Sequence, residues 1–278
     1  MKSKLRRLAS RIAEQSMENV RYLVADARAR LASGDSMVPP ESLVFVGTGD
    51  FEAVGEQFKG HLIELAGLMP DHQVLDVGCG IGRIAIPLTS YLSAKGGYRG
   101  IDIVKKGIRW CNSRITRRYR NFRFIHTDIH NRTYNRNGHL KADTFRFPFD
   151  DASFDVVLLT SVFTHMLPAD VSNYLGEISR VLKPGGRMLA TFFLLNKESN
   201  ALLKAGRAEF GLVRQSGVHA VRHTDRPEDA VGYDEDHVLD ELRRVGLDLV
   251  QPIHYGSWCG RPNFLSYQDM VIAEKPHA

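Results

Sequence analysis

Residues 74 to 83 read Val74-Leu75-Asp76-Val77-Gly78-Cys79-Gly80-Ile81-Gly82-Arg83, and this stretch decides the fold. An apolar run ends in an acid, three glycines follow at alternate positions, and a helical pattern begins. Glycine has no Cβ, so the main-chain N–H groups of such a loop can approach a ligand closely. The alternative is an ordinary turn between a strand and a helix. Three alternating glycines weaken a fold, however, unless a ligand or another group must approach the backbone closely. We therefore expect a loop that binds a nucleotide-type ligand.

The same loop argues against hydride chemistry. A dinucleotide-binding loop of the form Gly-x-Gly-x-x-Gly would need a third glycine at position 83, where Arg83 stands. The ligand is therefore expected to be something other than a nicotinamide or flavin dinucleotide.

The chain beyond this loop alternates short apolar runs with amphipathic stretches. Repeated strand, helix and strand predict an α/β fold in which a mostly parallel sheet is covered by helices on both faces. The last run follows its predecessor without room for a helix, so we expect it to pair antiparallel. The expected strands are residues 74–77, 98–104, 122–126, 155–161, 188–195, 247–254 and 267–273, and the expected helices are residues 84–93, 107–119, 169–182 and 236–245.

The N-terminal part of the chain is expected to be helical. Apolar residues at steps of three and four predict an amphipathic helix over residues 5–31. A second helix is expected over residues 51–68, with Asp50 as its N-cap. The basic start and leucine face of the first helix suit an anionic membrane surface, whereas packing over the rest of the protein explains the same stripe.

These patterns divide the chain into two parts. Residues 1–69 are expected to form an N-terminal helical extension or cap, and residues 70–278 the α/β domain. Residues 197–232 show no clean period. We expect them to form an irregular insertion that serves as a substrate lid.

Composition excludes several classes of protein. Hydrophobic residues make up 43% and charged residues 25%, which is typical of globular proteins. No apolar run approaches the ~20 residues that a bilayer crossing needs, and the basic N-terminus lacks the apolar block of a signal peptide. Cys79, Cys111 and Cys259 form no Cys-x-x-Cys pair, so neither a disulfide framework nor a thiolate zinc site is indicated. We expect a cytoplasmic protein without a metal, because no cluster of His, Asp and Glu appears either.

The motif Asp76-x-Gly78-x-Gly80-x-Gly82 resembles the first motif of the class I S-adenosylmethionine-dependent methyltransferases. Residues 147–157 are similar to the family's approach to its fourth strand, and residues 180–188 to its turn into the fifth. The resemblance runs from about residue 70 to 195. It implies a Rossmann-like sheet of about seven strands with the last one antiparallel, and S-adenosyl-L-methionine as the methyl donor.

The resemblance also assigns roles to two acids. Asp102 stands 22 residues after Gly80, where the family places an acid that accepts hydrogen bonds from the ribose hydroxyls. Asp128 follows the third strand, where the family places an acid against the adenine amino group, with Ile129 beside the ring. Each acid has a structural alternative, Asp102 as a cap of the next helix and Asp128 as a cap of a turn. The expected cofactor-binding residues are Asp76, Gly78, Cys79, Gly80, Gly82, Arg83, Asp102, Ile103, Asp128, Ile129 and Ser161.

The acceptor is expected at the carboxyl ends of the strands, where the strand order reverses. His165 follows the fourth strand and is the candidate general base, because imidazole titrates near neutral pH. The competing interpretation is that His165 only caps or packs the strand end. An aromatic and a cation in the loop after residue 254 suit a ring, a sugar or an acidic acceptor. The expected substrate contacts are His165, Tyr233, His254, Trp258 and Arg261.

The absence of two known motifs narrows the range of possible methyl acceptors. Amino-methylation of adenine in nucleic acid usually carries Asn/Asp-Pro-Pro-aromatic after the fourth strand, where Thr160-Ser-Val-Phe stands. Ring-carbon methylation of a pyrimidine needs a nucleophilic cysteine, and Cys111 and Cys259 each follow tryptophan in no such setting. We therefore predict methyl transfer to an oxygen or nitrogen of a small molecule, such as a metabolite, a sugar or a lipid-linked glycan.

An RNA-directed function is the alternative. The net charge of +5 says little by itself, but residues 95–123 hold ten basic residues against the single acid Asp102. Trp110, Tyr119 and Phe122 lie between them, as in a nucleic-acid surface. The competing interpretation, which we favour, is that these arginines form the solvated face of an outer helix. The sequence makes no prediction of the oligomeric state.

Overall fold

The computed structural model describes residues 36–45, 47, 49–215 and 217–277. The helix predicted over residues 5–31 lies outside this part of the chain. Within it, no helix is long and apolar enough to cross a membrane.

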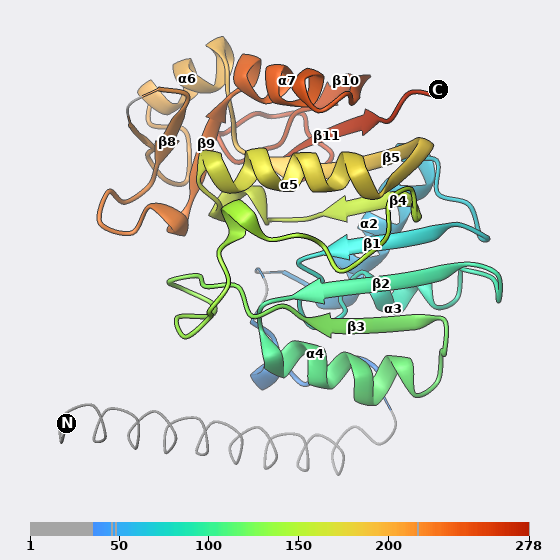
Figure 1. Ribbon diagram of the computed structural model, residues 1–278. Helices are drawn as coiled ribbons and strands as arrows, with labels where there is room; N and C mark the ends of the chain where they lie inside the picture. The colour runs from blue at the N-terminus through green and yellow to red at the C-terminus, as the bar shows by residue number, and fades with distance from the viewer. Residues whose placement is uncertain (1–35, 46, 48, 216, 278) are drawn as a thin grey trace, which may run out of the picture.

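The centre of the molecule is a seven-stranded sheet in the order β10-β11-β5-β4-β1-β2-β3 (Figure 1). Neighbours from β3 to β5 are parallel, whereas β11 runs antiparallel to both β5 and β10. The predicted Rossmann-like sheet with its reversed last strand is therefore confirmed. Its strands are β1 (Gln73–Val77), β2 (Gly97–Asp102), β3 (Phe122–His126), β4 (Phe154–Leu159), β5 (Leu182–Phe192), β10 (Asp248–His254) and β11 (Asp269–Glu274).

Helices cover both faces of this sheet. Apolar side chains of α2, α3 and α4 share one buried cluster with Val74 and Leu158, and those of α5 and α7 share another with Leu75 and Val157. Successive side chains of a strand point to opposite faces, which explains why neighbouring residues join different clusters. The helices are α2 (Phe51–Glu64), α3 (Ala85–Leu88), α4 (Lys105–Cys111), α5 (Pro168–Val181) and α7 (Glu235–Arg244), with short turns η1 (Glu41–Leu43), η2 (Asn112–Thr116), η3 (Ala142–Thr144) and η4 (Phe163–His165).

The helix α2 begins where the sequence predicts. The carboxylate of Asp50 accepts hydrogen bonds from the backbone N–H groups of Glu52 and Ala53 at 2.9 and 2.8 Å. These bonds satisfy donors that have no partner inside the helix. Phe58 and Leu62 then pack in the same cluster as strand residues of the sheet, so this part of residues 1–69 joins the core of the α/β domain.

The helix after the glycine loop is shorter than predicted. Residues 84–93 were expected to be helical, but α3 ends at Leu88. The hydroxyls of Thr89 and Ser90 donate to the carbonyls of Ile86 and Pro87 at 2.6 and 3.0 Å. Such local bonds compete with the continuation of a helix.

Residues 197–232 are more regular than predicted. They contain α6 (Lys197–Lys204), β7 (Val213–Arg214), β8 (His219–Val221) and η5 (Pro227–Asp229). With β6 (Leu194–Leu195) and β9 (Val231–Asp234) they build a four-stranded sheet in the order β6-β9-β8-β7, beside α6 in Figure 1. These strands are two to four residues long, which is too short for a hydrophobic period to appear in the sequence.

Candidate functional site

A cavity of about 1220 Å³ opens at the edge of the large sheet where β1, β2 and β4 end. The carboxyl ends of parallel strands meet at one edge, so the loops that follow them share this space. Of the predicted cofactor-binding residues, Gly82 and Asp128 do not line the cavity. The residues of that set that line it are Asp76, Gly78, Cys79, Gly80, Arg83, Asp102, Ile103, Ile129 and Ser161.

The glycine loop folds back over the end of β2. The N–H groups of Gly78 and Cys79 donate to the carbonyl of Ile101 at 2.8 and 3.1 Å. Gly78 has φ +84°, and a Cβ there would overlap the Cγ2 atom of Val162. Gly82 has φ +88°, and a Cβ there would lie 2.7 Å from a side-chain carbon of Ile115. Both backbone conformation and close packing therefore require glycine at these positions.

Asp102 holds the loop and faces the cavity. Its carboxylate accepts the N–H of Gly80 at 2.7 Å and the N–H of Val104 at 2.6 Å, and burial raises its pKa to about 6. Val104 is the N-cap of α4, so Asp102 holds the residue before that helix, although no side chain caps α4 itself among the described residues. Each carboxylate oxygen keeps a second lone pair, so the carboxylate can also accept hydroxyl groups from a ligand in the cavity.

Asp76 is a buried carboxylate with an incomplete set of partners. One oxygen accepts the hydroxyl of Tyr98, while Oδ1 has no partner among the described residues. Burial raises the pKa of Asp76 to about 7. A buried polar atom without a hydrogen bond is costly, so an orphan oxygen in a residue that lines a cavity indicates a ligand with an N–H or O–H group there.

Asp128 is turned toward its own loop. Its carboxylate contacts Nδ1 of His139 at 2.6 Å and accepts from the side-chain amide of Asn135 at 3.3 Å. The bond to His139 is the main cause of the lowered pKa of Asp128. The carboxylate of Asp128 thus joins side chains of its own loop, while the neighbours Thr127 and Ile129 line the cavity.

His165 lines the cavity from η4, the turn that follows β4. Its Nδ1 lies 3.0 Å from the carbonyl oxygen of Glu228, and the ring of Tyr134 meets the imidazole edge-on at 5.7 Å. A carbonyl only accepts, so Nδ1 carries the hydrogen and Nε2 the lone pair. Burial lowers the pKa of His165, which keeps the imidazole neutral near pH 7. This arrangement suits a proton acceptor.

Two further walls of the cavity carry Arg83, a predicted cofactor-binding residue, and Gln268, which has no predicted role. Arg83 lies beside Phe51 of α2, with its guanidinium carbon 5.2 Å from the ring centroid. Gln268 lies just before β11, and its side chain reaches Thr191 of β5 and Ser161 after β4. No pattern around Gln268 signals this position, because only the pairing of β11 with β5 brings the residue there.

The four other predicted substrate contacts do not line the cavity. Tyr233 is fully buried, and its hydroxyl donates to the carbonyl of Met166 at 2.6 Å. His254 ends β10 and is half-buried outside the cavity wall. These two residues therefore support the packing around the site, which corrects the predicted contact with an acceptor.

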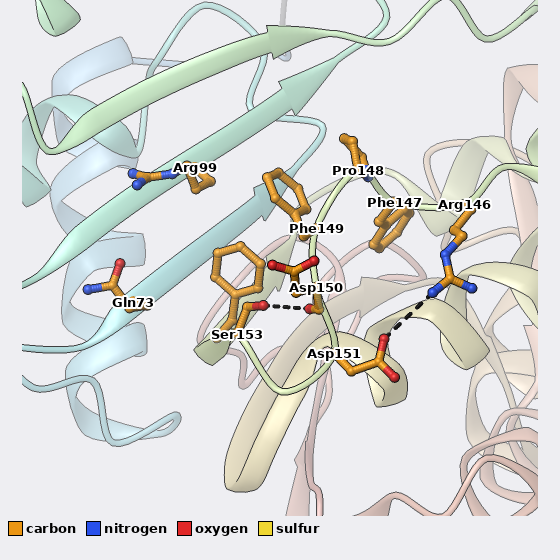
Figure 2. A pocket seen from close by; sticks show the side chains of 10 residues that line it. Gln73, Arg99, Arg146, Phe147, Pro148, Phe149, Asp150, Asp151 and Ser153 are labelled. Carbon is orange, nitrogen blue, oxygen red and sulfur yellow. Dashed lines mark hydrogen bonds and ion pairs between the residues drawn. The ribbon is translucent and has the colours of Figure 1, made fainter.

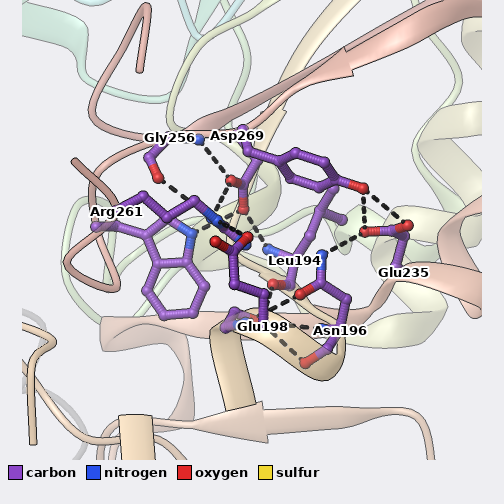
Figure 3. A network of polar contacts seen from close by, with 10 residues as sticks. Leu194, Asn196, Glu198, Glu235, Gly256, Arg261 and Asp269 are labelled. Carbon is purple, nitrogen blue, oxygen red and sulfur yellow. Dashed lines mark hydrogen bonds and ion pairs between the residues drawn. The ribbon is translucent and has the colours of Figure 1, made fainter. Parts of the chain in front are cut away.

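Trp258 and Arg261 belong to a buried polar network instead (Figure 3). The carboxylate of Asp269 accepts the indole N–H of Trp258 at 2.7 Å and a guanidinium N–H of Arg261 at 3.0 Å. The same carboxylate accepts the backbone N–H groups of Leu194 and Gly256, each at 2.7 Å. The aromatic and the cation of this loop, which suggested a ligand clamp, therefore join β6 and α6 to the large sheet.

A second hollow of about 830 Å³ lies at the opposite edge of the sheet, where β1 begins at Gln73 (Figure 2). Its rim carries Arg99 and the loop around Asp151, which lies 3.6 Å from the guanidinium of Arg146. The hollow is therefore separated by the length of the strands from the glycine loop and His165.

The described residues hold no group of three or more His, Cys, Asp or Glu side chains that is suited to a metal ion. Within the same residues Cys79, Cys111 and Cys259 are free and buried, and burial raises the pKa of each thiol. Cys79 therefore acts as a small side chain packed under the glycine loop.

The fold and the glycine loop together indicate the class of protein. A family described as a methyltransferase domain matches residues 75–190, the segment from the glycine loop to β5. This segment is a methyltransferase domain, and its relatives are methyltransferases of the kind that use S-adenosylmethionine as the methyl donor.

Particular relatives differ in their acceptors. A tRNA N(3)-cytidine methyltransferase of Gallus gallus is 27% identical over 211 residues, which cover 72% of this chain and 49% of the relative. Phthiotriol/phenolphthiotriol dimycocerosates methyltransferase 1 of Mycobacterium ulcerans is 35% identical over 129 residues, which cover 46% of this chain and 39% of the relative. The chain thus spans half the length or less of these curated relatives.

The fold is also shared with a solved structure. The 1,6-didemethyltoxoflavin-N1-methyltransferase of Burkholderia thailandensis, with bound 1,6-didemethyltoxoflavin and S-adenosylhomocysteine, has a TM-score of 0.50 and 16% identity. The alignment covers 94% of this chain and 90% of that one. At this level of identity the likeness concerns the fold.

Proposed function

We propose that the protein transfers a methyl group from S-adenosyl-L-methionine, by in-line displacement, to an oxygen or nitrogen of a small-molecule acceptor such as a metabolite, a sugar or a lipid-linked glycan. One observation supports this most: a single cavity contains the glycine loop, Asp102 and, beyond the end of β4, Ser161 and His165. Its volume of about 1220 Å³ exceeds the roughly 300–1,000 Å³ of ordinary ligand pockets. The cavity therefore has room for a cofactor and an acceptor side by side.

The residues at the β1 and β2 ends suit the adenosyl and amino-acid parts of the cofactor. The free lone pairs of Asp102 accept the ribose hydroxyls, and the orphan oxygen of Asp76 accepts an N–H or O–H group, directly or through water. The guanidinium of Arg83 at the cavity wall supplies a positive charge for a carboxylate. When bound, the cofactor supplies a methyl carbon activated by a sulfonium.

The residues after β4 suit the acceptor. His165, neutral and held through Nδ1, takes at Nε2 the proton that the hydroxyl or amine of the acceptor loses. The walls of the cavity hold the acceptor in one orientation. General base catalysis of this kind contributes roughly 10²–10⁴-fold in rate.

The test is transfer of a tritiated methyl group from the cofactor into a metabolite extract. We expect transfer by the wild type and its loss in Asp102→Ala, because the ribose acceptor and the bond to Gly80 are both removed. Asp240→Ala, which removes an exposed carboxylate of α7, is the matched control and should leave transfer intact. Undiminished transfer by Asp102→Ala would refute the site.

The alternative acceptor is RNA, which the coverage of 72% of this chain by the tRNA methyltransferase supports. The structure weakens this alternative. Arg114 is buried over the ring of Trp110 at 4.8 Å, and Arg99 donates to backbone carbonyls. The basic residues from 117 to 120 lie between η2 and β3, and Arg123 is the second residue of β3, at the sheet edge opposite the cavity.

Binding to RNA separates the two acceptors. If RNA is the acceptor, the protein should be retained on immobilised RNA at low salt, with an affinity that falls steeply as salt is added. We expect no such retention. Salt-sensitive retention together with methyl transfer to RNA would replace the small molecule as the acceptor.

A further inference from the structure

Three polar side chains from distant parts of the chain close a ring of hydrogen bonds at the cavity wall. The backbone N–H of Ser161 donates to Oγ1 of Thr191 at 2.7 Å, and the Thr191 hydroxyl lies 2.6 Å from Oε1 of Gln268. Nε2 of Gln268 in turn donates to Oγ of Ser161 at 2.9 Å. The ring joins the turn after β4, the end of β5 and the residue before β11.

The direction of each bond follows from the chemistry of the groups. A backbone N–H can only donate, so Thr191 uses a lone pair for Ser161 and sends its own hydrogen to Gln268. Thr191 is 1% exposed, so the described protein groups decide where this hydrogen goes. The oxygen of the Gln268 amide therefore faces Thr191, and its NH₂ group faces Ser161.

The ring leaves hydrogen-bond donors at the cavity surface. Ser161 and Gln268 line the cavity, whereas the buried Thr191 does not. The second N–H of Gln268 has no partner among the described residues. The hydroxyl of Ser161 forms a long hydrogen bond of 3.4 Å with that of Thr164, in which Thr164 can be the donor and leave the Ser161 hydrogen for a ligand. Two donors thus stand together in the same cavity as His165.

The backbone of Ser161 is strained to make this arrangement. Its φ is +57°, a left-handed conformation that is unfavourable for a residue with a Cβ. Such strain persists only where the surroundings impose it, and it collects at functional sites. Here the bond from its N–H to Thr191 holds the conformation, and the side chain of Ser161 is exposed at the end of a buried strand.

We propose that Gln268 and Ser161 select acceptors that carry a carbonyl-type oxygen, of a ketone, ester, amide or carboxylate, beside the hydroxyl or amine to be methylated. This inference rests on the proposed function. The oxygen lone pairs meet the two donors, while the group to be methylated faces His165, which lies in the same turn after β4. Gln268 is a positioning and specificity residue, because it holds the acceptor and takes no proton.

The competing occupant of these donors is the amino-acid carboxylate of the cofactor itself. Arg83 at the other wall of the cavity offers that carboxylate a full positive charge, which a neutral amide does not match. The affinity for S-adenosylhomocysteine therefore distinguishes the two assignments.

The test uses the full chain saturated with S-adenosylhomocysteine and a matched pair of probes, acetophenone and α-methylstyrene. The two have the same shape, but only acetophenone has an oxygen that accepts a hydrogen bond. Binding is followed by NMR titration. In Gln268→Leu we expect acetophenone affinity to fall by about 3- to 10-fold, the effect of one lost hydrogen bond, with no change for α-methylstyrene or S-adenosylhomocysteine.

Two variants of Thr191 control for folding. Thr191→Val removes the hydroxyl that orients the amide and should reproduce the loss, whereas Thr191→Ser keeps the hydroxyl and should bind acetophenone as the wild type does. Equal changes for both probes, or no binding of acetophenone to the wild type, would overturn the inference. A loss confined to S-adenosylhomocysteine would assign the donors to the cofactor. Failure of the wild type to bind S-adenosylhomocysteine would overturn the proposed function itself.

Discussion

Replacing Gly78 with alanine should destabilise the protein strongly, and the structure allows the loss to be divided into two parts. At φ +84° an alanine adopts a left-handed conformation, which costs about 1–2 kcal/mol. The added Cβ overlaps Cγ2 of Val162, and relieving such overpacking costs about 1–3 kcal/mol. The reduced freedom of the unfolded chain returns about 0.4–1 kcal/mol. The net decrease in the free energy of unfolding is therefore about 1–5 kcal/mol.

Urea unfolding followed by fluorescence and circular dichroism measures this change. Gly60→Ala in α2 and Gly176→Ala in α5 are matched controls, because a Cβ at either position meets no atom within 4 Å. Alanine at these helical positions should raise the free energy of unfolding by about 0.5–1 kcal/mol. In a Val162→Ala background the overlap disappears. Gly78→Ala should then lower the free energy of unfolding by only about 1–2 kcal/mol, the cost of the left-handed backbone conformation.

The affinity for S-adenosylhomocysteine is the second measurement on these variants. We expect Gly78→Ala to weaken it, because the loop cannot keep its backbone N–H groups in place, while Gly60→Ala leaves it unchanged. The reasoning is refuted if Gly78→Ala is as stable as the Gly60→Ala control, or if Val162→Ala recovers none of the loss.

Three further predictions concern charged and titrating groups. Burial raises the pKa of Asp102 to about 6, and only the carboxylate accepts two ribose hydroxyls. Calorimetry should therefore show S-adenosylhomocysteine affinity falling as the pH drops through about 6, and Asp102→Asn should lose this step and keep only the one from Asp76 near pH 7. His165→Gln should lower kcat/KM by roughly 10²–10⁴-fold without changing S-adenosylhomocysteine affinity. Because the pKa of His165 is lowered, the wild-type rate should decline only on the acid side of the ordinary histidine range, and a profile that still rises well above pH 7 would contradict a neutral His165. Asp269→Ala should lower the free energy of unfolding, measured with urea, by about 3–5 kcal/mol, because the buried charge of Arg261 then lacks this partner. A decrease of less than about 1 kcal/mol would contradict the network of Figure 3.

Much of the fold is predictable from local sequence. The strands β1, β3 and β10 and the helices α5 and α7 lie within about two residues of their predicted bounds, because their apolar positions follow a clear period. The glycine loop and the acid at the end of β2 are equally local features, since spacing along ten or twenty residues is enough to place them together. The small sheet within residues 193–234 was not predictable, because strands of two to four residues carry no period.

The candidate site likewise has residues that local sequence predicts and residues that it does not. Asp102 and His165 follow directly from the ends of β2 and β4, and the structure places both in the cavity. Trp258 and Arg261 have the composition of a ligand clamp, yet Asp269 holds both inside the protein. A sequence shows that an aromatic and a cation stand in a loop, but not which buried group will satisfy them.

Local patterns in the sequence are therefore enough to predict the methyltransferase domain, the cofactor loop and the order of strand and helix, because backbone conformation and burial depend on residues that are close along the chain. The set of side chains that line the cavity follows only from the packing of distant segments. Gln268 meets Ser161 across 107 residues because β11 inserts beside β5, and Asp128 turns away because His139 lies within its own loop. Contacts between distant segments depend on how the elements pack, which no local pattern of residues records.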